Sequence, residues 1–152
     1  ETKFLTEFLN AEKIEDDKYK TKVFKKTADN WITNAISEDM KMAEDIRSML
    51  NYTLKEKETV DVKKFAENSI QDKELQESFN EHMEDRGLTE NFEIDKKWIE
   101  KKLKNRNIKT DTGFSIKGKL TDFEDPMKYS FRKNENGTFD IVLKNITFYE
   151  EK

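Results

Sequence analysis

The stretch KKWIEKKLKNRNIKTDTG at residues 96–113 marks the point where the sequence changes from a helical to a strand-like pattern. Asp95, immediately before it, is a favourable N-cap for a short helix. The apolar residues of this helix, Trp98, Ile99 and Leu103, share one side at helical spacing. After residue 107 apolar and polar residues alternate, as in a half-buried strand, and the apolar positions are Phe114, Ile116, Gly118 and Leu120. The sequence is therefore expected to be helical before this stretch and β-rich after it.

On the N-terminal side, apolar residues recur at helical spacing. The residues from Phe4 to Leu9 indicate an amphipathic helix that is already under way at the start of the chain. The further helices expected here are one at 20–36, one at 37–55 with Ser37 as N-cap, a short one capped by Asp61, and one from Asp72 to a left-handed C-cap at Gly87.

On the C-terminal side, two strand-like segments, 129–133 and 138–144, flank the turn sequence NENG. A two-residue turn would leave most apolar residues of the second strand facing polar partners. A three-residue loop instead pairs Phe131 with Ile141 and places Arg132 opposite Asp140. We therefore predict the three-residue loop, with Gly137 left-handed.

These patterns predict an α+β fold, with an N-terminal helical part of four to five helices followed by a small antiparallel β-sheet with a C-terminal hairpin. We expect one domain over residues 1–152, mainly helical over 1–106 and mainly β over 107–152. Because the chain opens at Glu1, inside what reads as a helix, we also expect it to be a C-terminal fragment of a longer chain.

The charge of the stretch differs from that of the whole chain, which carries a net charge of -4. Between residues 96 and 109, seven basic residues stand against one acidic residue. Such local asymmetry is typical of a surface that binds a polyanion. The alternative is a solvated helix face behind buried apolar residues. The candidate nucleic-acid-binding residues are Lys97, Lys101, Lys102, Lys104, Arg106 and Lys109.

Motifs for catalysis or cofactor binding are sparse. The chain has no cysteine, and its four glycines form no phosphate-binding loop, so we predict no enzyme activity, no cofactor and no small-molecule substrate. The single histidine, His82, reads as a surface residue. The acidic cluster Asp122, Glu124 and Asp125 leaves a metal-dependent hydrolase as a remaining alternative, although a polar turn explains it better. No apolar run is long enough to cross a membrane.

Three segments, 61–70, 94–116 and 123–146, resemble the C-terminal part of the bacterial nucleoid-associated protein family. The shared features are a Trp followed by a basic helix, the sequence IKTDTG, and the strand NGTFDIVLKNI. The resemblance implies a cytoplasmic protein of the nucleoid without enzyme activity. It supplies no set of DNA-contacting residues, so the candidates remain those found from charge.

Two functions follow from these observations. The first is a nucleoid-associated module that binds duplex DNA without strong sequence preference through a basic helix-strand patch. The second is a protein-protein interaction or dimerisation module that reaches the nucleoid through a partner or through the missing N-terminal part. The pI near 5.3, which is unusual for a DNA-binding domain, keeps the second function open.

Overall fold

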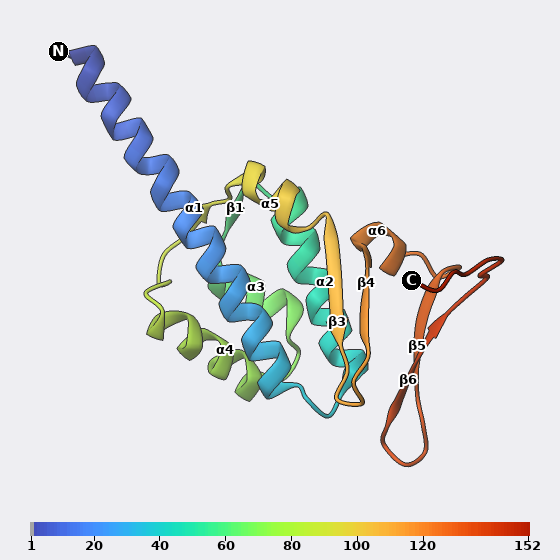
Figure 1. Ribbon diagram of the computed structural model, residues 1–152. Coiled ribbons are helices and arrows are strands. Elements are labelled where there is room, and N and C mark those ends of the chain that lie inside the picture. The colour runs from blue at the N-terminus through green and yellow to red at the C-terminus, as the bar shows by residue number, and fades with distance from the viewer. Residues whose placement is uncertain (1) are drawn as a thin grey trace. The chain divides into compact units, whose positions relative to one another are not determined.

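The computed structural model describes residues 2–152 and, within them, contains six helices and six strands (Figure 1). The strands of this range pair in three antiparallel two-stranded sheets. The expected α+β fold with a C-terminal hairpin is therefore confirmed, with three small sheets in place of one. The chain divides into two compact units, of which unit 1 ends at Glu100 and unit 2 covers Lys101–Lys152.

Helix α1, Thr2–Ala35, is one continuous helix. Its second half is the predicted core-facing helix. The side chains that this half buries include Phe24, Ala28, Trp31 and Ile32. The apolar residues of the first half face solvent, since Phe4 is 73% exposed and Phe8 52% exposed. The amphipathic pattern at the start of the chain therefore belongs to the same helix but not to the core of unit 1.

Helix α2, Met40–Glu56, begins later than expected. The predicted N-cap, Ser37, is wrong: the N-cap is Asp39, whose carboxylate accepts a backbone N–H of the first turn. The buried Ile36 still donates its N–H to the Ile32 carbonyl, which prolongs the last turn of α1 and moves the start of α2. The buried side chains of α2 are Ile46, Leu50 and Leu54.

The caps predicted for the next two helices are confirmed. Asp61 caps α3, Val62–Ser69, and Asp72 caps α4, Lys73–Asp85, in each case by accepting backbone N–H groups of the first turn. Gly87 follows α4 with a left-handed φ of 80°. The N–H groups of Gly87 and of the next residue return to carbonyls of the last helical turn, as in a Schellman motif.

An aromatic cluster fills the core of unit 1. The Phe79 ring lies edge-on to Trp31 and to Phe24, with ring centroids 5.2 and 6.4 Å apart. The ring centroid of Phe65 lies 5.5 Å from those of Phe24 and Phe79. The ring centroids of Phe92 and Phe24 are 5.7 Å apart. Contacts of this geometry add about 0.5–1.5 kcal/mol per pair to the burial of the rings. The two short paired strands of this unit are β1, Thr59–Val60, and β2, Phe92–Glu93.

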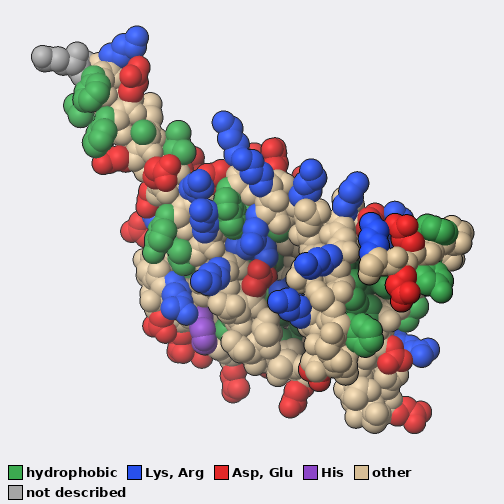
Figure 2. All heavy atoms as spheres, viewed as in Figure 1, with side chains coloured by type: hydrophobic (Ala, Val, Ile, Leu, Met, Phe, Trp, Pro, Cys, Tyr) green, Lys and Arg blue, Asp and Glu red, His purple; other side chains and the backbone are tan. Residues whose placement is uncertain are grey.

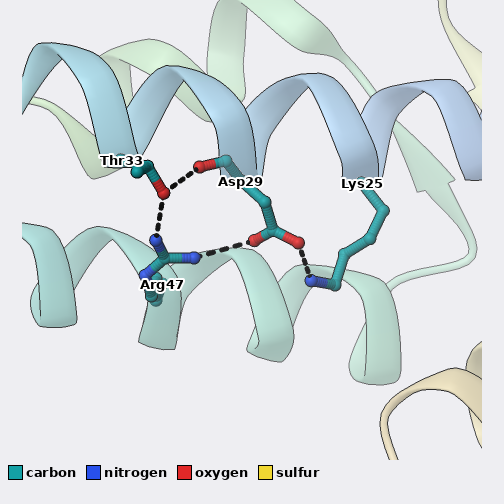
Figure 3. A network of polar contacts seen from close by, with 4 residues as sticks. All are labelled: Lys25, Asp29, Thr33 and Arg47. Atoms are coloured by element: carbon teal, nitrogen blue, oxygen red, sulfur yellow. Dashed lines mark hydrogen bonds and ion pairs between the residues drawn. The ribbon is translucent and has the colours of Figure 1, made fainter. Parts of the chain in front are cut away.

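A polar network joins α1 to α2 (Figure 3). Arg47 of α2 donates hydrogen bonds of 3.0 Å to the Asp29 carboxylate and to the Thr33 hydroxyl. Lys25, one turn before Asp29, pairs with the second oxygen of the same carboxylate. The side chains of Arg47 and Asp29 are only 26% and 32% exposed. Solvent therefore screens this network less than it screens a pair on the open surface.

Helix α5, Lys96–Lys102, begins in unit 1 and its last two residues belong to unit 2. The predicted cap is confirmed, since the Asp95 carboxylate accepts the Trp98 N–H at 3.0 Å. Unit 2 then consists of two hairpins and one short helix. Its elements are β3, Asn105–Lys109; β4, Ser115–Lys119; α6, Leu120–Phe123; β5, Tyr129–Lys133; and β6, Phe139–Leu143.

The C-terminal hairpin has the predicted register. In β5–β6, Phe131 faces Ile141, and Arg132 faces Asp140. Gly137 has a φ of 86°, the left-handed conformation that the three-residue loop requires. The Arg132 guanidinium donates two hydrogen bonds of 3.1 Å to the Asp140 carboxylate on the exposed side of the hairpin. The choice of loop length from cross-strand pairing is thus confirmed.

Loss of the Arg47 side chain should destabilise unit 1, because the half-buried Asp29 carboxylate loses a charged partner. We expect Arg47→Ala to lower the free energy of unfolding by about 1–2 kcal/mol. The measurement is urea denaturation followed by tryptophan fluorescence. Lys41→Ala is the matched control, because its pair with Asp45 is largely exposed, and it should cost less than about 0.5 kcal/mol. Equal losses in the two variants would contradict a stabilising role for the network.

The Asp140 carboxyl should titrate at a lower pH than a free aspartate. Hydrogen bonds from Asn134 and Arg132 stabilise its charged form and lower its pKa. A lowered folded-state pKa stabilises the fold above the ordinary aspartate pKa, and this stability is lost as the pH falls through the folded value. Asn134→Ala should therefore raise the pKa of Asp140 in an NMR titration of its carboxyl carbon. An unchanged pKa would show that the hydrogen bond from Asn134 has no such effect.

Candidate nucleic-acid interface

The six candidate residues are divided between the two units. Lys97 lies in the part of α5 that belongs to unit 1, and its side chain is exposed. The other five belong to unit 2: Lys101 and Lys102 at the end of α5, Lys104 in the bend before β3, and Arg106 and Lys109 within β3. Most of the candidate basic residues therefore belong to unit 2.

One face of the β3–β4 hairpin carries only polar and basic side chains. Lys109 of β3 shares this face with Lys117 and Lys119 of β4, because Asn105 pairs with Lys119 and Asn107 pairs with Lys117. All three lysines are exposed. No acidic residue occurs in either strand. Figure 2 shows blue Lys and Arg side chains over β3 and β4 on the viewed face.

Lys117 and Lys119 were not among the candidates, although the sequence contained a signal for them. They are the polar half of the alternation that predicts β4. Only the pairing of β4 with β3, which the sequence did not reveal, brings them beside Lys109. A basic residue in a strand has to be judged with its cross-strand neighbours, because pairing places residues of the two strands about 5 Å apart.

Arg106 lies on the opposite face of the hairpin from Lys109, because strand side chains alternate. Its guanidinium carbon lies 5.3 Å from the centre of the Phe123 ring, a cation–π arrangement. Gly118 pairs with Arg106, and a Cβ atom at this glycine would come within 3.3 Å of the same ring. The close approach of Phe123 to the hairpin explains why a glycine stands at this position. Arg106 therefore contributes to the packing of unit 2.

The lysines at the end of α5 surround a buried anchor. Leu103 is 8% exposed, whereas Lys101, Lys102 and Lys104 are exposed. Lys101 and Lys102 lie in the last helical turn, where the helix dipole favours positive charge. The Lys104 carbonyl accepts the N–H of Leu120 at 3.0 Å, which ties the bend before β3 to the start of α6.

Phe114 does not join the apolar face expected for the strand. It stands in the turn before β4 and is 70% exposed. Its N–H bonds to the Thr110 hydroxyl at 3.0 Å, and its carbonyl accepts the Thr110 N–H at 2.9 Å. The alternation is confirmed within β4, where Ile116 is half-buried between exposed Ser115 and Lys117. Leu120 is buried but begins α6, so the expected strand ends one residue earlier. The turn geometry at Thr110 holds the aromatic ring at the exposed end of the hairpin.

The two units differ in charge. Unit 2 contains 12 Lys and Arg against 8 Asp and Glu, a net charge of +4. The remaining 17 Lys and Arg and 25 Asp and Glu give unit 1 a net charge of -8. The acidic pI of the whole chain thus comes from unit 1. The face of the β3–β4 hairpin that carries Lys109, Lys117 and Lys119, here called the lysine face, belongs to a basic unit.

The other candidate chemistry finds little support in the described part of the chain. His82 is exposed, and its Nδ1 lies 2.9 Å from the Ser78 carbonyl oxygen. Asp122 forms an ion pair of 2.9 Å with Lys128, and Asp125 accepts the N–H of Met127. Among residues 2–152, no three His, Cys, Asp or Glu side chains are placed to hold a metal ion together. No helix in this range combines the length and apolarity of a membrane span.

Comparison with known protein families identifies a match. The family model described as nucleoid-associated protein YejK matches residues 1–151 of this sequence. Searches against curated proteins and against solved structures found no match. Because the match extends over nearly every residue of the sequence, the chain belongs to the family of the nucleoid-associated protein YejK.

Proposed function

We propose that this chain is a non-enzymatic nucleoid-associated protein that binds duplex DNA without strong sequence preference. The family description supports association with the nucleoid, and so a location in the bacterial cytoplasm. The observation that carries DNA contact is the lysine face of β3–β4, formed by Lys109, Lys117 and Lys119 without an acidic neighbour in either strand.

Phosphate contact explains how such a face binds DNA. Each lysine that neutralises a phosphate releases a condensed counterion, and this release drives association regardless of base sequence. The major groove of B-DNA admits a two-stranded β-ribbon, the shape of this hairpin. Lys117 and Lys119 are two residues apart in β4, about 7 Å along the strand, and point to the same face.

The candidates outside this face have different parts in the proposal. Lys101, Lys102 and Lys104 extend the positive charge of unit 2 and contact the DNA backbone beside the hairpin. Lys97 belongs to unit 1 and lies one helical turn before Lys101 in α5. Arg106 acts indirectly, because its guanidinium lies over Phe123 on the other face and holds the hairpin to α6.

A second function is favoured by the apolar side chains on the surface. Phe4, Leu5, Phe8 and Leu9 of α1 are each more than half exposed, as are Ile146, Phe148 and Tyr149 near the C-terminus. Contiguous apolar surface is typical of protein–protein contact. A chain that fails to bind DNA at low salt would therefore favour the interaction module, which reaches the nucleoid through a partner.

Removal of the lysine face should weaken DNA binding and reduce its salt dependence. We expect the triple variant Lys109→Gln, Lys117→Gln and Lys119→Gln to lower the slope of log affinity against log salt by about 0.9 for each phosphate that is no longer neutralised. Fluorescence anisotropy of a labelled duplex at several salt concentrations measures this slope. The matched control replaces the exposed unit 1 residues Lys22, Lys63 and Lys64 by Gln. The proposal is wrong if both triple variants bind as the unaltered chain does.

Arg106→Gln should affect stability more than DNA binding. Loss of the cation–π interaction should lower the free energy of unfolding of unit 2 by about 0.5–1 kcal/mol. Denaturation monitored by the NMR signals of β4 residues measures this effect. The salt slope of DNA binding should stay close to that of the unaltered chain, because Arg106 lies off the lysine face. A fall in the slope by about 0.9, the value for one lost phosphate contact, would instead make Arg106 a phosphate contact.

A further inference from the structure

The outer edge of β6 has unpaired backbone groups. In the ladder with β5, the pairs that exchange hydrogen bonds alternate, and the bonds at its two ends are Asn134 N–H to Thr138 and Lys144 N–H to Lys128. Residues 140 and 142 therefore direct their backbone groups toward β5. Phe139, Ile141 and Leu143 direct theirs away from it. Within the described residues, β6 pairs with no strand other than β5 (Figure 1).

The β6 edge lacks the features that prevent strands from pairing with one another. Edge strands are usually protected by charged residues, proline or bulges. The other edge of the hairpin, β5, carries Arg132 and Lys133, which are both exposed. In contrast, β6 has the sequence FDIVL, with one charge and no proline, and its Leu143 is 50% exposed. The two edges of the same hairpin thus differ in their ability to accept a further strand.

We propose that the β6 edge pairs antiparallel with β6 of a second copy of this chain, which joins two hairpins into a four-stranded sheet. A two-fold axis at Val142 brings the outward-directed backbone groups of the two β6 strands together. Ile141 then exchanges backbone hydrogen bonds with Leu143 of the second copy, and Leu143 does so with Ile141 of the second copy. The same register places Asp140 opposite Lys144 of the second copy, twice by symmetry. In this register opposite charges face each other and apolar side chains face each other, so the β6 edge is complementary to itself.

Alternative symmetric registers are less favourable. An axis at Ile141 places Asp140 opposite Val142 of the second copy, so its carboxylate keeps its bonds to Arg132 and Asn134 but gains no opposite charge across the interface. An axis at Asp140 brings the two carboxylates together, which is destabilising. Two-stranded hairpins are marginally stable by themselves, and a third or fourth strand is the usual way to stabilise them. Charge complementarity and backbone direction thus both favour β6 of a second copy, paired with the two-fold axis at Val142.

Sedimentation velocity of the full chain over a wide range of concentration tests the dimer. We expect a reversible monomer–dimer equilibrium. Leu143→Lys should abolish the dimer, whereas Met127→Lys, which introduces a lysine at a 66% exposed apolar residue outside β6, should not. Lys144→Glu should weaken the dimer by about tenfold, because two pairs become repulsive. Lys133→Glu, the same change on β5, is its matched control. A monomer at every concentration, or a dimer that survives Leu143→Lys, would overturn the proposal.

Hydrogen exchange identifies the edge independently of the variants. The amides of Ile141 and Leu143 should become protected as concentration rises, because they bond across the new interface. The amides of Asp140 and Val142 should be protected at all concentrations, because they already point toward β5. This alternation also distinguishes β6 pairing from a dimer formed through the apolar residues of α1. Concentration-independent exchange at both odd-numbered positions would exclude the β6 interface.

Discussion

The surfaces of unit 2 depend on one constraint, which is the alternation of side chains along its strands. Successive residues of a strand point to opposite faces, and unit 2 has few buried side chains: Leu103, Leu120 and Tyr129. One face of the β3–β4 hairpin must therefore pack against the rest of unit 2. Ile108 and Ile116 are half-buried there, and Arg106 lies over Phe123. The lysines on the other face take no part in packing, which leaves their charge available for a ligand.

The separation of charge between the units bears on how an acidic protein can bind DNA. Charges on exposed groups interact only over about 8 Å at physiological ionic strength, so DNA responds to the surface it touches rather than to the net charge of the chain. The basic unit 2 has a face on which lysines meet no acidic neighbour in the strands. The pI of 5.3 reflects the acidic unit 1 and is therefore a weak argument against DNA contact.

The sequence predicted features that depend on local chemistry. The caps Asp61, Asp72 and Asp95 and the left-handed Gly137 follow from hydrogen bonds or backbone conformations within a few residues. Even the register of β5–β6 could be predicted, because a short loop leaves few possible pairings.

Features that depend on distant partners could not be predicted in this way. The cap Ser37 was wrong because the burial of Ile36 prolongs α1. The lysine face was only partly found, since Lys117 and Lys119 join Lys109 through a pairing that no local pattern specifies. The sequence does not distinguish Arg106 from the neighbouring lysines, because its contact with Phe123 depends on the packing of α6 against the hairpin. A dimer through β6 would give each assembly two lysine faces, and linking two weak DNA contacts raises the overall affinity without any new contact. Weak, salt-sensitive contacts of a single copy would then be enough for stable association with DNA.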